Sequence, residues 1–158
     1  MKIVIDDLSS NDVIRLLREH LDDMYKTSPP ESVHALDISA LKSPMITFFS
    51  AWQGQSLMGC VAIKKLDQKK VELKSMRTAH KFRNQGVASK LLKHAINFAI
   101  DQNFESINLE TGTQDYFEPA RRLYKKFGFT LCEPFHDYKL DPNSTFMTFD
   151  LIHVSKFE

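Results

Sequence analysis

The stretch from Met76 to Ala95, MRTAHKFRNQGVASKLLKHA, joins a strand-like pattern to a helical pattern through one short loop. Before the loop, residues 71–78 read VELKSMRT, the pattern of a largely buried strand. After it, apolar residues recur at helical spacing along a single face: Val87, Leu91, Leu92, Ala95, Phe98 and Ala99. A helical crossover of this kind places the next strand, SINLET at 106–111, parallel to the first. The sequence therefore predicts an α/β fold.

Other segments supply further strands of the same sheet. Short polar turns separate three strand-like runs and make them antiparallel neighbours: residues 45–52, 57–66 and 71–78. Shorter apolar runs add strands at residues 3–5, 129–135 and 146–154. The expected sheet is mixed and mostly antiparallel, with six or seven strands and a parallel pair at the crossover.

Helical patterns predict layers on both faces of this sheet. The first runs from the candidate N-caps at 9–12 to about Tyr25, and a second, shorter one falls within 31–42. The last carries Phe117, Ala120, Leu123, Tyr124 and Phe127, with Gly128 as its stop. A chain of 158 residues has room for one such domain, so residues 1–158 are expected to fold as a single unit.

The net charge of +1 gives no support for binding nucleic acid in bulk, but the charges are unevenly placed. Residues 64–93 are strongly basic, whereas residues 6–37 carry eight acidic side chains against three basic ones. No apolar run reaches the roughly twenty residues of a membrane span, and the N-terminus does not have the pattern of a signal peptide. Cys60 and Cys132 fall in expected strands as free, buried thiols, which favours a cytoplasmic protein.

The loop RNQGVAS is expected to bind an anion, and phosphate is the expected ligand. It opens a helix, where unpaired backbone N–H groups and the positive end of the helix dipole attract negative charge. Arg83 adds mobile positive charge, and Gly86 allows a ligand to approach the backbone. The segment lacks the Gly-Lys pair of a P-loop and has only one glycine of the GxGxxG fingerprint, so neither nucleotide motif fits.

The pattern RxxGxA, here Arg83, Gly86 and Ala88, resembles the acyl-CoA loop of the GNAT superfamily of N-acyltransferases. The later segment LETGTQDYFEPARRLYKKFGF is similar to that family's strand, helix and AxxLYxxxGF motif. The resemblance spans residues 45–151, and the chain's ending is similar to that of a small, poorly characterised bacterial subgroup. It implies a GNAT-like sheet whose parallel strands splay apart at the cofactor site.

The resemblance also implies where acetyl-CoA would bind. Backbone amides from Gln85 to Ser89 would hold the pyrophosphate, and the strand at Met76 and Thr78 would pair with the pantetheine arm. Many family members have an asparagine seven residues before the motif tyrosine, and here Phe117 stands in its place. The expected cofactor-binding residues are Met76, Arg77, Thr78, Arg83, Asn84, Gln85, Gly86, Val87, Ala88, Ser89, Phe117 and Ala120.

For catalysis, the resemblance gives Tyr124 the role of general acid toward the leaving thiolate. A base is also needed, because an alkyl amine with a pKa near 10.4 is neutral in only about one molecule in 2,500 at pH 7. Glu72 lies six residues before Thr78 on the same face of the strand, where some family members carry a glutamate acting through water. Glu110 is a second candidate. The histidines and cysteines show no metal-binding spacing, so no metal is expected.

The expected function is acetyl transfer from acetyl-CoA to an amine by direct attack in a ternary complex. The acidic N-terminal region favours a small, cationic acceptor, since that region forms the acceptor side in the family. Two alternatives remain open: a non-catalytic acyl-CoA sensor, and an acyltransferase acting on a protein lysine or N-terminus. A homodimer through the C-terminal strands is common in the family.

Overall fold

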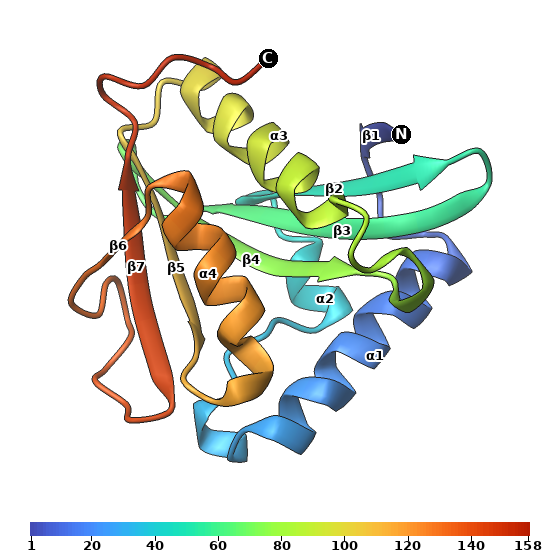
Figure 1. Cartoon of the computed structure of the whole chain (residues 1–158), viewed down its shortest axis with the longest axis horizontal. Coiled ribbons are helices and arrows are strands. Elements are labelled where there is room, and N and C mark those ends of the chain that lie inside the picture. Colours follow the sequence, from blue (N-terminus) through green and yellow to red (C-terminus); the bar gives the residue numbers. More distant parts are fainter.

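A seven-stranded sheet forms the centre of the computed structural model, which describes residues 1–158 (Figure 1). Its spatial order is β1-β2-β3-β4-β5-β7-β6, and every neighbouring pair is antiparallel except β4 and β5. The strands are β1 (Lys2–Ile5), β2 (Ile46–Gln53), β3 (Ser56–Lys65), β4 (Lys70–Thr78), β5 (Ser106–Gly112), β6 (Thr130–Leu131) and β7 (Ser144–Asp150). The predicted mixed sheet with one parallel pair is confirmed.

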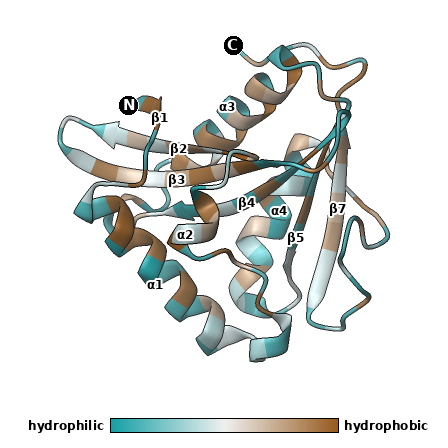
Figure 2. Cartoon of the chain, turned by 180° about the vertical axis from the view of Figure 1, so that it is seen from behind, coloured by the Kyte–Doolittle hydropathy of each residue, from teal (hydrophilic) through white to brown (hydrophobic).

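Helices cover both faces of the sheet, as the apolar patterns predict. Helices α3 (Val87–Asp101) and α4 (Glu118–Phe127) lie on one face, and α1 (Asn11–Thr27) with α2 (Ile38–Leu41) on the other (Figures 1 and 2). The α3 side holds a core of 21 buried residues, and the α1 side a smaller core of eight. None of the helices is both long enough and apolar enough to cross a bilayer.

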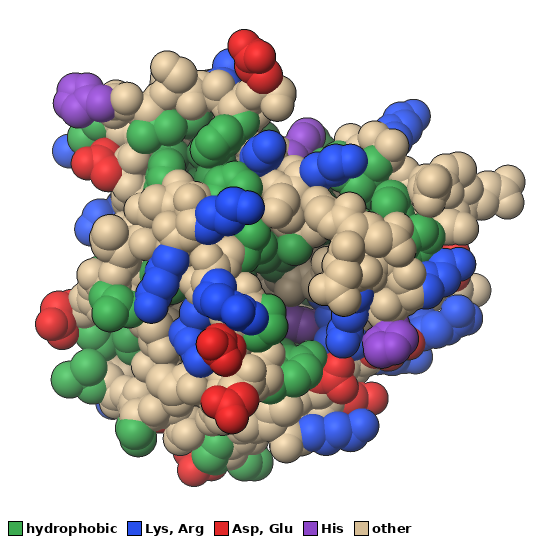
Figure 3. Space-filling view, in the orientation of Figure 1, with side chains coloured by type: hydrophobic (Ala, Val, Ile, Leu, Met, Phe, Trp, Pro, Cys, Tyr) green, Lys and Arg blue, Asp and Glu red, His purple; other side chains and the backbone are tan.

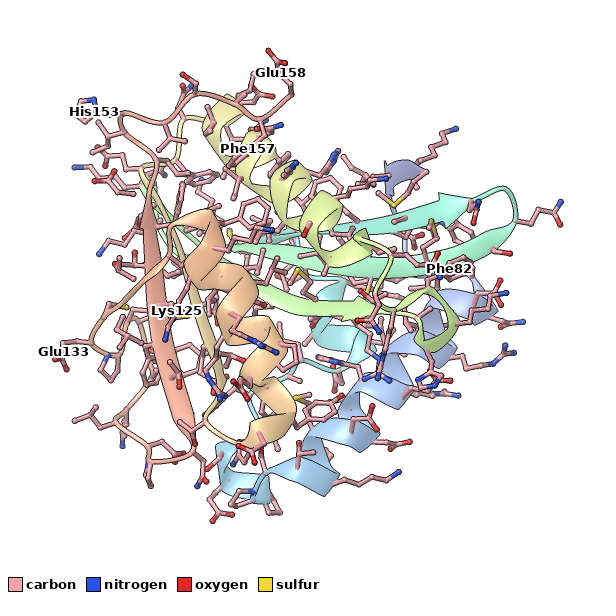
Figure 4. The ribbon with its side chains drawn as sticks, in the orientation of Figure 1. Phe82, Lys125, Glu133, His153, Phe157 and Glu158 are labelled. Carbon is pink, nitrogen blue, oxygen red and sulfur yellow. The ribbon has the colours of Figure 1, made fainter.

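Local chemistry sets the ends of the helices. The Ser10 side chain accepts a hydrogen bond from the Val13 amide at 3.2 Å and so caps α1. Asn103, just after the end of α3, has a left-handed backbone with a φ of +64°, and Gly128 ends α4 with a φ of +107°. The C-terminal tail then returns to α3, where Asn97 and the backbone of Phe157 exchange two hydrogen bonds of 2.7 and 2.8 Å (Figure 4).

Strands β4 and β5 pair over only three residues of each strand, Lys70–Glu72 with Ser106–Asn108. Beyond Glu72 the two strands part. Ser75 in β4 has a φ of +54°, and the β3–β4 register shifts beside it, so the strand bulges where it separates from β5. The gap that opens between the parallel strands is the structural basis of the site described below.

Three details of the sequence prediction were wrong. The second helix is limited to Ile38–Leu41, preceded by a 3₁₀ turn at Pro30–Ser32, because the Asp37 side chain caps the backbone amide of Ala40 and starts the helix there. Strand β6 has two residues instead of seven, since Pro134 has no N–H to extend the ladder. Cys132 lies just outside β6 and is only half-buried, whereas Cys60 is fully buried in β3.

Candidate functional site

A cavity of about 540 Å³ occupies the gap between β4 and β5. Its walls come from both splayed strands, the loop before α3, one side of α4, the last turns of α1 and the segment after it. Seen from the side shown in Figure 3, the surface of the molecule is hollowed between α3, α4 and α1, and Lys and Arg side chains lie around the hollow. Helices from both sides of the sheet therefore contribute residues to one open cavity.

The loop before α3 presents a row of free backbone donors. The amides from Gln85 to Ser89 donate no hydrogen bond to any protein group, and the first helical bond at this end runs from the Lys90 amide to the Gly86 carbonyl. Asn84 and Gly86 both adopt left-handed backbone, with φ of +62° and +81°. A 15-residue helix directs its positive end at the same place, so an anion would find donors and dipole together.

Gly86 serves this loop through its conformation. A Cβ built on Gly86 would meet nothing within 4 Å, so protein crowding does not demand glycine there. Its φ of +81° does, since side chains disfavour that region. The open space beside it leaves room for a ligand to reach the backbone. Phe82, buried just before the loop, anchors the segment to the α3-side core (Figure 4).

At the unpaired end of β4, successive side chains point to opposite faces of the sheet. Met76 packs against the α3-side core, while Arg77 points to the opposite face and pairs with Asp23 of α1. Met76, Arg77 and Thr78 all line the cavity, and their edge toward β5 carries no strand partner. The structure thus brings the predicted pantetheine strand and, except for Gln85, the predicted pyrophosphate loop to the wall of one cavity.

Tyr124 projects from α4 into the same cavity. Its side chain is buried beside the ring of Phe129, and no protein group accepts a hydrogen bond from its hydroxyl. Burial, and to a smaller extent the charge of Glu110, raises the pKa of Tyr124 above that of a free tyrosine. The hydroxyl therefore stays protonated at neutral pH and is available as a donor.

Phe117, which replaces the family asparagine, and Ala120 also reach the cavity wall. Phe117 is buried with its ring packed over Gly112, where a side chain would collide with it. Next to this contact, Arg121 donates hydrogen bonds to the carbonyls of Gly112 and Gln114 at 2.6 and 3.0 Å. The Phe117 ring thus holds the turn between β5 and α4 by packing. Unlike an asparagine, it offers the cavity no side-chain hydrogen-bonding group.

Glu72 is part of a buried polar cluster. Its Oε2 accepts hydrogen bonds from Lys74 Nζ at 3.2 Å and from the Tyr138 hydroxyl at 2.5 Å. Lys74 also donates to the Tyr138 hydroxyl and to the backbone carbonyl of His34. Sequence reasoning did not find Lys74 or Tyr138, because Tyr138 comes from the loop between β6 and β7 and no motif marks it.

Glu110, on β5, faces the cavity without a cation bound to it. Burial raises the pKa of Glu110 to about 7. The two acids at the site therefore differ: Glu72 is held by a lysine and a tyrosine, while Glu110 can gain or lose a proton near neutral pH.

None of the eight acidic residues between positions 6 and 37 lines the cavity. Several serve local structure instead: Asp6 accepts from Ser50, Asp37 caps α2, and Asp23 pairs with Arg77. The charged side chains that line the cavity are Glu72, Lys74, Arg77, Arg83 and Glu110, with His20 and His34 beside them. The acidic N-terminal region therefore does not make the cavity wall acidic.

The chain matches the Acetyltransferase (GNAT) family over residues 13–129. It is 52% identical to the uncharacterized N-acetyltransferase YsnE of Bacillus subtilis over 148 residues, covering 94% of this chain and 98% of that protein. Its fold is similar to the crystal structure of a putative acyl-CoA N-acyltransferase from Klebsiella pneumoniae, with a TM-score of 0.77, 24% identity and coverage of 96% and 97% of the two chains.

A GNAT family acetyltransferase from Elizabethkingia anophelis, whose structure has acetyl-CoA bound, shares the fold with a TM-score of 0.66 and 19% identity over 95% of this chain and 97% of that one. The match over most of the chain agrees with the splayed strands and the open loop at the start of α3. The chain therefore belongs to the GNAT family of acetyltransferases.

Proposed function

We propose that this protein transfers the acetyl group of acetyl-CoA to the amine of a small molecule, by direct attack while both substrates occupy the cavity. The observation that carries the proposal is the row of unengaged amides from Gln85 to Ser89, placed where β4 and β5 part. Those amides, with Arg83 beside them, would hold the pyrophosphate. The free edge of β4 at Met76 and Thr78 would pair with the pantetheine arm.

The cavity supplies a proton donor for the leaving group. As the amine nitrogen bonds to the acetyl carbon, the bond from that carbon to sulfur breaks and leaves a thiolate. Tyr124 would give its phenolic proton to this thiolate, which its protonated, unpartnered hydroxyl favours. The base that takes the proton of the amine then passes it to solvent, and solvent returns a proton to the tyrosinate.

For the proton acceptor we propose Glu110 in place of Glu72. Glu72 Oε2 already accepts two hydrogen bonds, one of them from the Lys74 ammonium, so protein donors occupy this oxygen. Glu110 lines the cavity with a pKa near 7, which suits a base working at neutral pH. Glu72, acting through water, is the alternative base, and the pH dependence of turnover distinguishes the two carboxylates.

Release of free thiol from acetyl-CoA over a panel of amines tests the function. We expect turnover with at least one class of small amine, and saturable acetyl-CoA binding without any amine. Acetyl-CoA binding with no turnover on small amines, proteins or peptides would instead favour a sensor that retains the site but has lost catalysis. An absence of binding at millimolar acetyl-CoA would contradict the proposal.

A further inference from the structure

Arg77 is a buried cation with unused hydrogen-bonding capacity. Its side chain is only 8% exposed, at the end of β4 on the wall of the cavity. Nη1 contacts Asp23 Oδ2 at 2.7 Å and the Tyr116 hydroxyl at 3.4 Å, and both polar contacts of the guanidinium use this nitrogen. Nε is buried without any partner. Because a guanidinium has five N–H donors, most of its capacity is free.

Leaving the Nε donor of Arg77 unpaired in a buried position is costly. A buried polar group without a hydrogen-bond partner destabilises a protein, and a charged one does so more strongly. Beside Arg77, on the neighbouring strand β3, lies Cys60, whose thiol is fully buried in the α1-side core and donates to the Ser75 carbonyl. Neither the Cys60 thiol nor the Ser75 carbonyl accepts a hydrogen bond from the Arg77 guanidinium, and because Arg77 lines the cavity, an acceptor can approach it from there.

Among the basic residues that line this part of the cavity, Arg77 is the cation with free hydrogen-bond donors. His20 of α1 is neutral at physiological pH, since burial, and next the charge of Arg77, lowers its pKa to about 4. Lys74 is fully engaged by Glu72, Tyr138 and the carbonyl of His34. Arg83 lies at the loop before α3, on the expected pyrophosphate side.

We propose that Arg77 binds a carboxylate group of the acceptor, so that the acceptor is an amino carboxylate. A guanidinium presents two parallel N–H groups that match the two oxygens of a carboxylate, which makes arginine the preferred residue for this contact. Arg77 on β4 and Glu110 on β5 line the same cavity, so one would hold the carboxylate while the other receives the amine proton. This inference rests on the proposed transfer to an amine.

The experiment compares amino acids with their matched amides as acceptors. We use α-, β- and γ-amino acids, each beside the amide of the same chain length, and measure kcat/KM by thiol release. We expect the best carboxylate to exceed its amide by about tenfold or more, the size of one charge-assisted contact. Arg77→Gln should lose that preference, and Arg77→Lys should keep only part of it.

Asp23→Asn is the matched variant, because it removes the only acidic partner of Arg77 and leaves the arginine in place. A carboxylate-binding Arg77, freed from Asp23, should keep the preference for the acid or increase it. If the pair merely anchors α1 to β4, Arg77→Gln and Asp23→Asn should lower the activity on acids and amides alike, and that result would overturn the proposal.

A binding measurement separates this inference from the proposed function. Thermal unfolding with acetate, propanoate or butanoate requires no turnover, and these ions should raise the Tm of the wild type but not of Arg77→Gln. If no amine causes release of thiol from acetyl-CoA, but the carboxylate ions still stabilise the wild type and not Arg77→Gln, the proposed acetyl transfer is wrong and the carboxylate site is supported. If amides are acetylated at least as fast as acids, transfer stands and the carboxylate site is wrong.

Discussion

Lys74 Nζ lies 3.2 Å from Glu72 Oε2, and both side chains are at least nine-tenths buried. The pair is completed by Tyr138, whose hydroxyl donates to the same carboxylate oxygen. Glu110, on the neighbouring strand, has no such cation. One strand thus offers an acid paired with a lysine, and the other an acid whose pKa is raised to about 7. The proposal of Glu110 as the base rests on this difference.

The pH dependence of turnover should follow Glu110. Because the base must be ionised, kcat/KM is expected to rise with pH and to level off above about pH 7, the pKa of this carboxyl. Glu110→Gln should lower kcat/KM by about 10² or more and remove this limb of the profile.

The control for that profile must not leave the buried Lys74 without its counter-charge. Glu72→Gln alone leaves Lys74 as an uncompensated buried charge and risks unfolding, so Glu72→Gln with Lys74→Met is the better variant. We expect this double variant to retain the limb near pH 7. Loss of the limb in the double variant and its survival in Glu110→Gln would return the role of base to Glu72.

Glu110 should also affect folding stability. Its pKa is raised from 4.5 to about 7, so the folded state binds more protons than the unfolded state between these values, and stability falls as pH rises through that window. At pH 8, Glu110→Gln should therefore be more stable than the wild type by on the order of 2 kcal/mol, allowing for water around a partly exposed group. At pH 4 the difference should vanish. Urea unfolding at both pH values measures it.

Tyr124→Phe should lower kcat by about 10² or more, because the leaving thiolate loses its proton donor. The KM for acetyl-CoA should change little, since the ring that packs beside Phe129 remains. Tyr25→Phe, an exposed tyrosine of α1 outside the cavity, is the matched control and should behave as the wild type. Equal rates for both variants would show that Tyr124 is not the general acid.

Gly86→Ala should combine a small loss of stability with a large loss of cofactor affinity. The φ of +81° costs an alanine about 1 kcal/mol, and the strained loop would shift its amides. Gly54 has a φ of +58° and equally open surroundings, but it lies in the β2–β3 turn outside the cavity. Gly54→Ala should therefore show a similar stability loss with normal acetyl-CoA binding by calorimetry. Equal binding by both variants would contradict the role of the loop.

Sequence reasoning recovered the features that depend on local patterns. The strand, loop and helix around Gly86 are local, and the apolar spacing of α3 and the stop at Gly128 need no distant partner. The parallel pairing of β4 with β5 followed from the handedness and length of one crossover.

The contacts that could not be predicted join distant segments. Tyr138 meets Glu72 across 66 positions, and Tyr116 meets Asp23 across 93, through loops whose path carries no periodicity. The uneven distribution of charge along the chain was also a poor guide to the cavity, because none of the eight acids of residues 6–37 lines it. Three of them instead cap α2 or bind Ser50 and Arg77.

The most direct test of the central claim is an amide NMR titration with coenzyme A. If the loop before α3 grips the pyrophosphate, the amides from Gln85 to Ser89 should shift on adding coenzyme A. Pantetheine, which has no pyrophosphate, should leave them in place while still shifting Met76 and Thr78. Binding of coenzyme A that leaves the five loop amides unmoved, or no binding at millimolar concentration, would contradict the account.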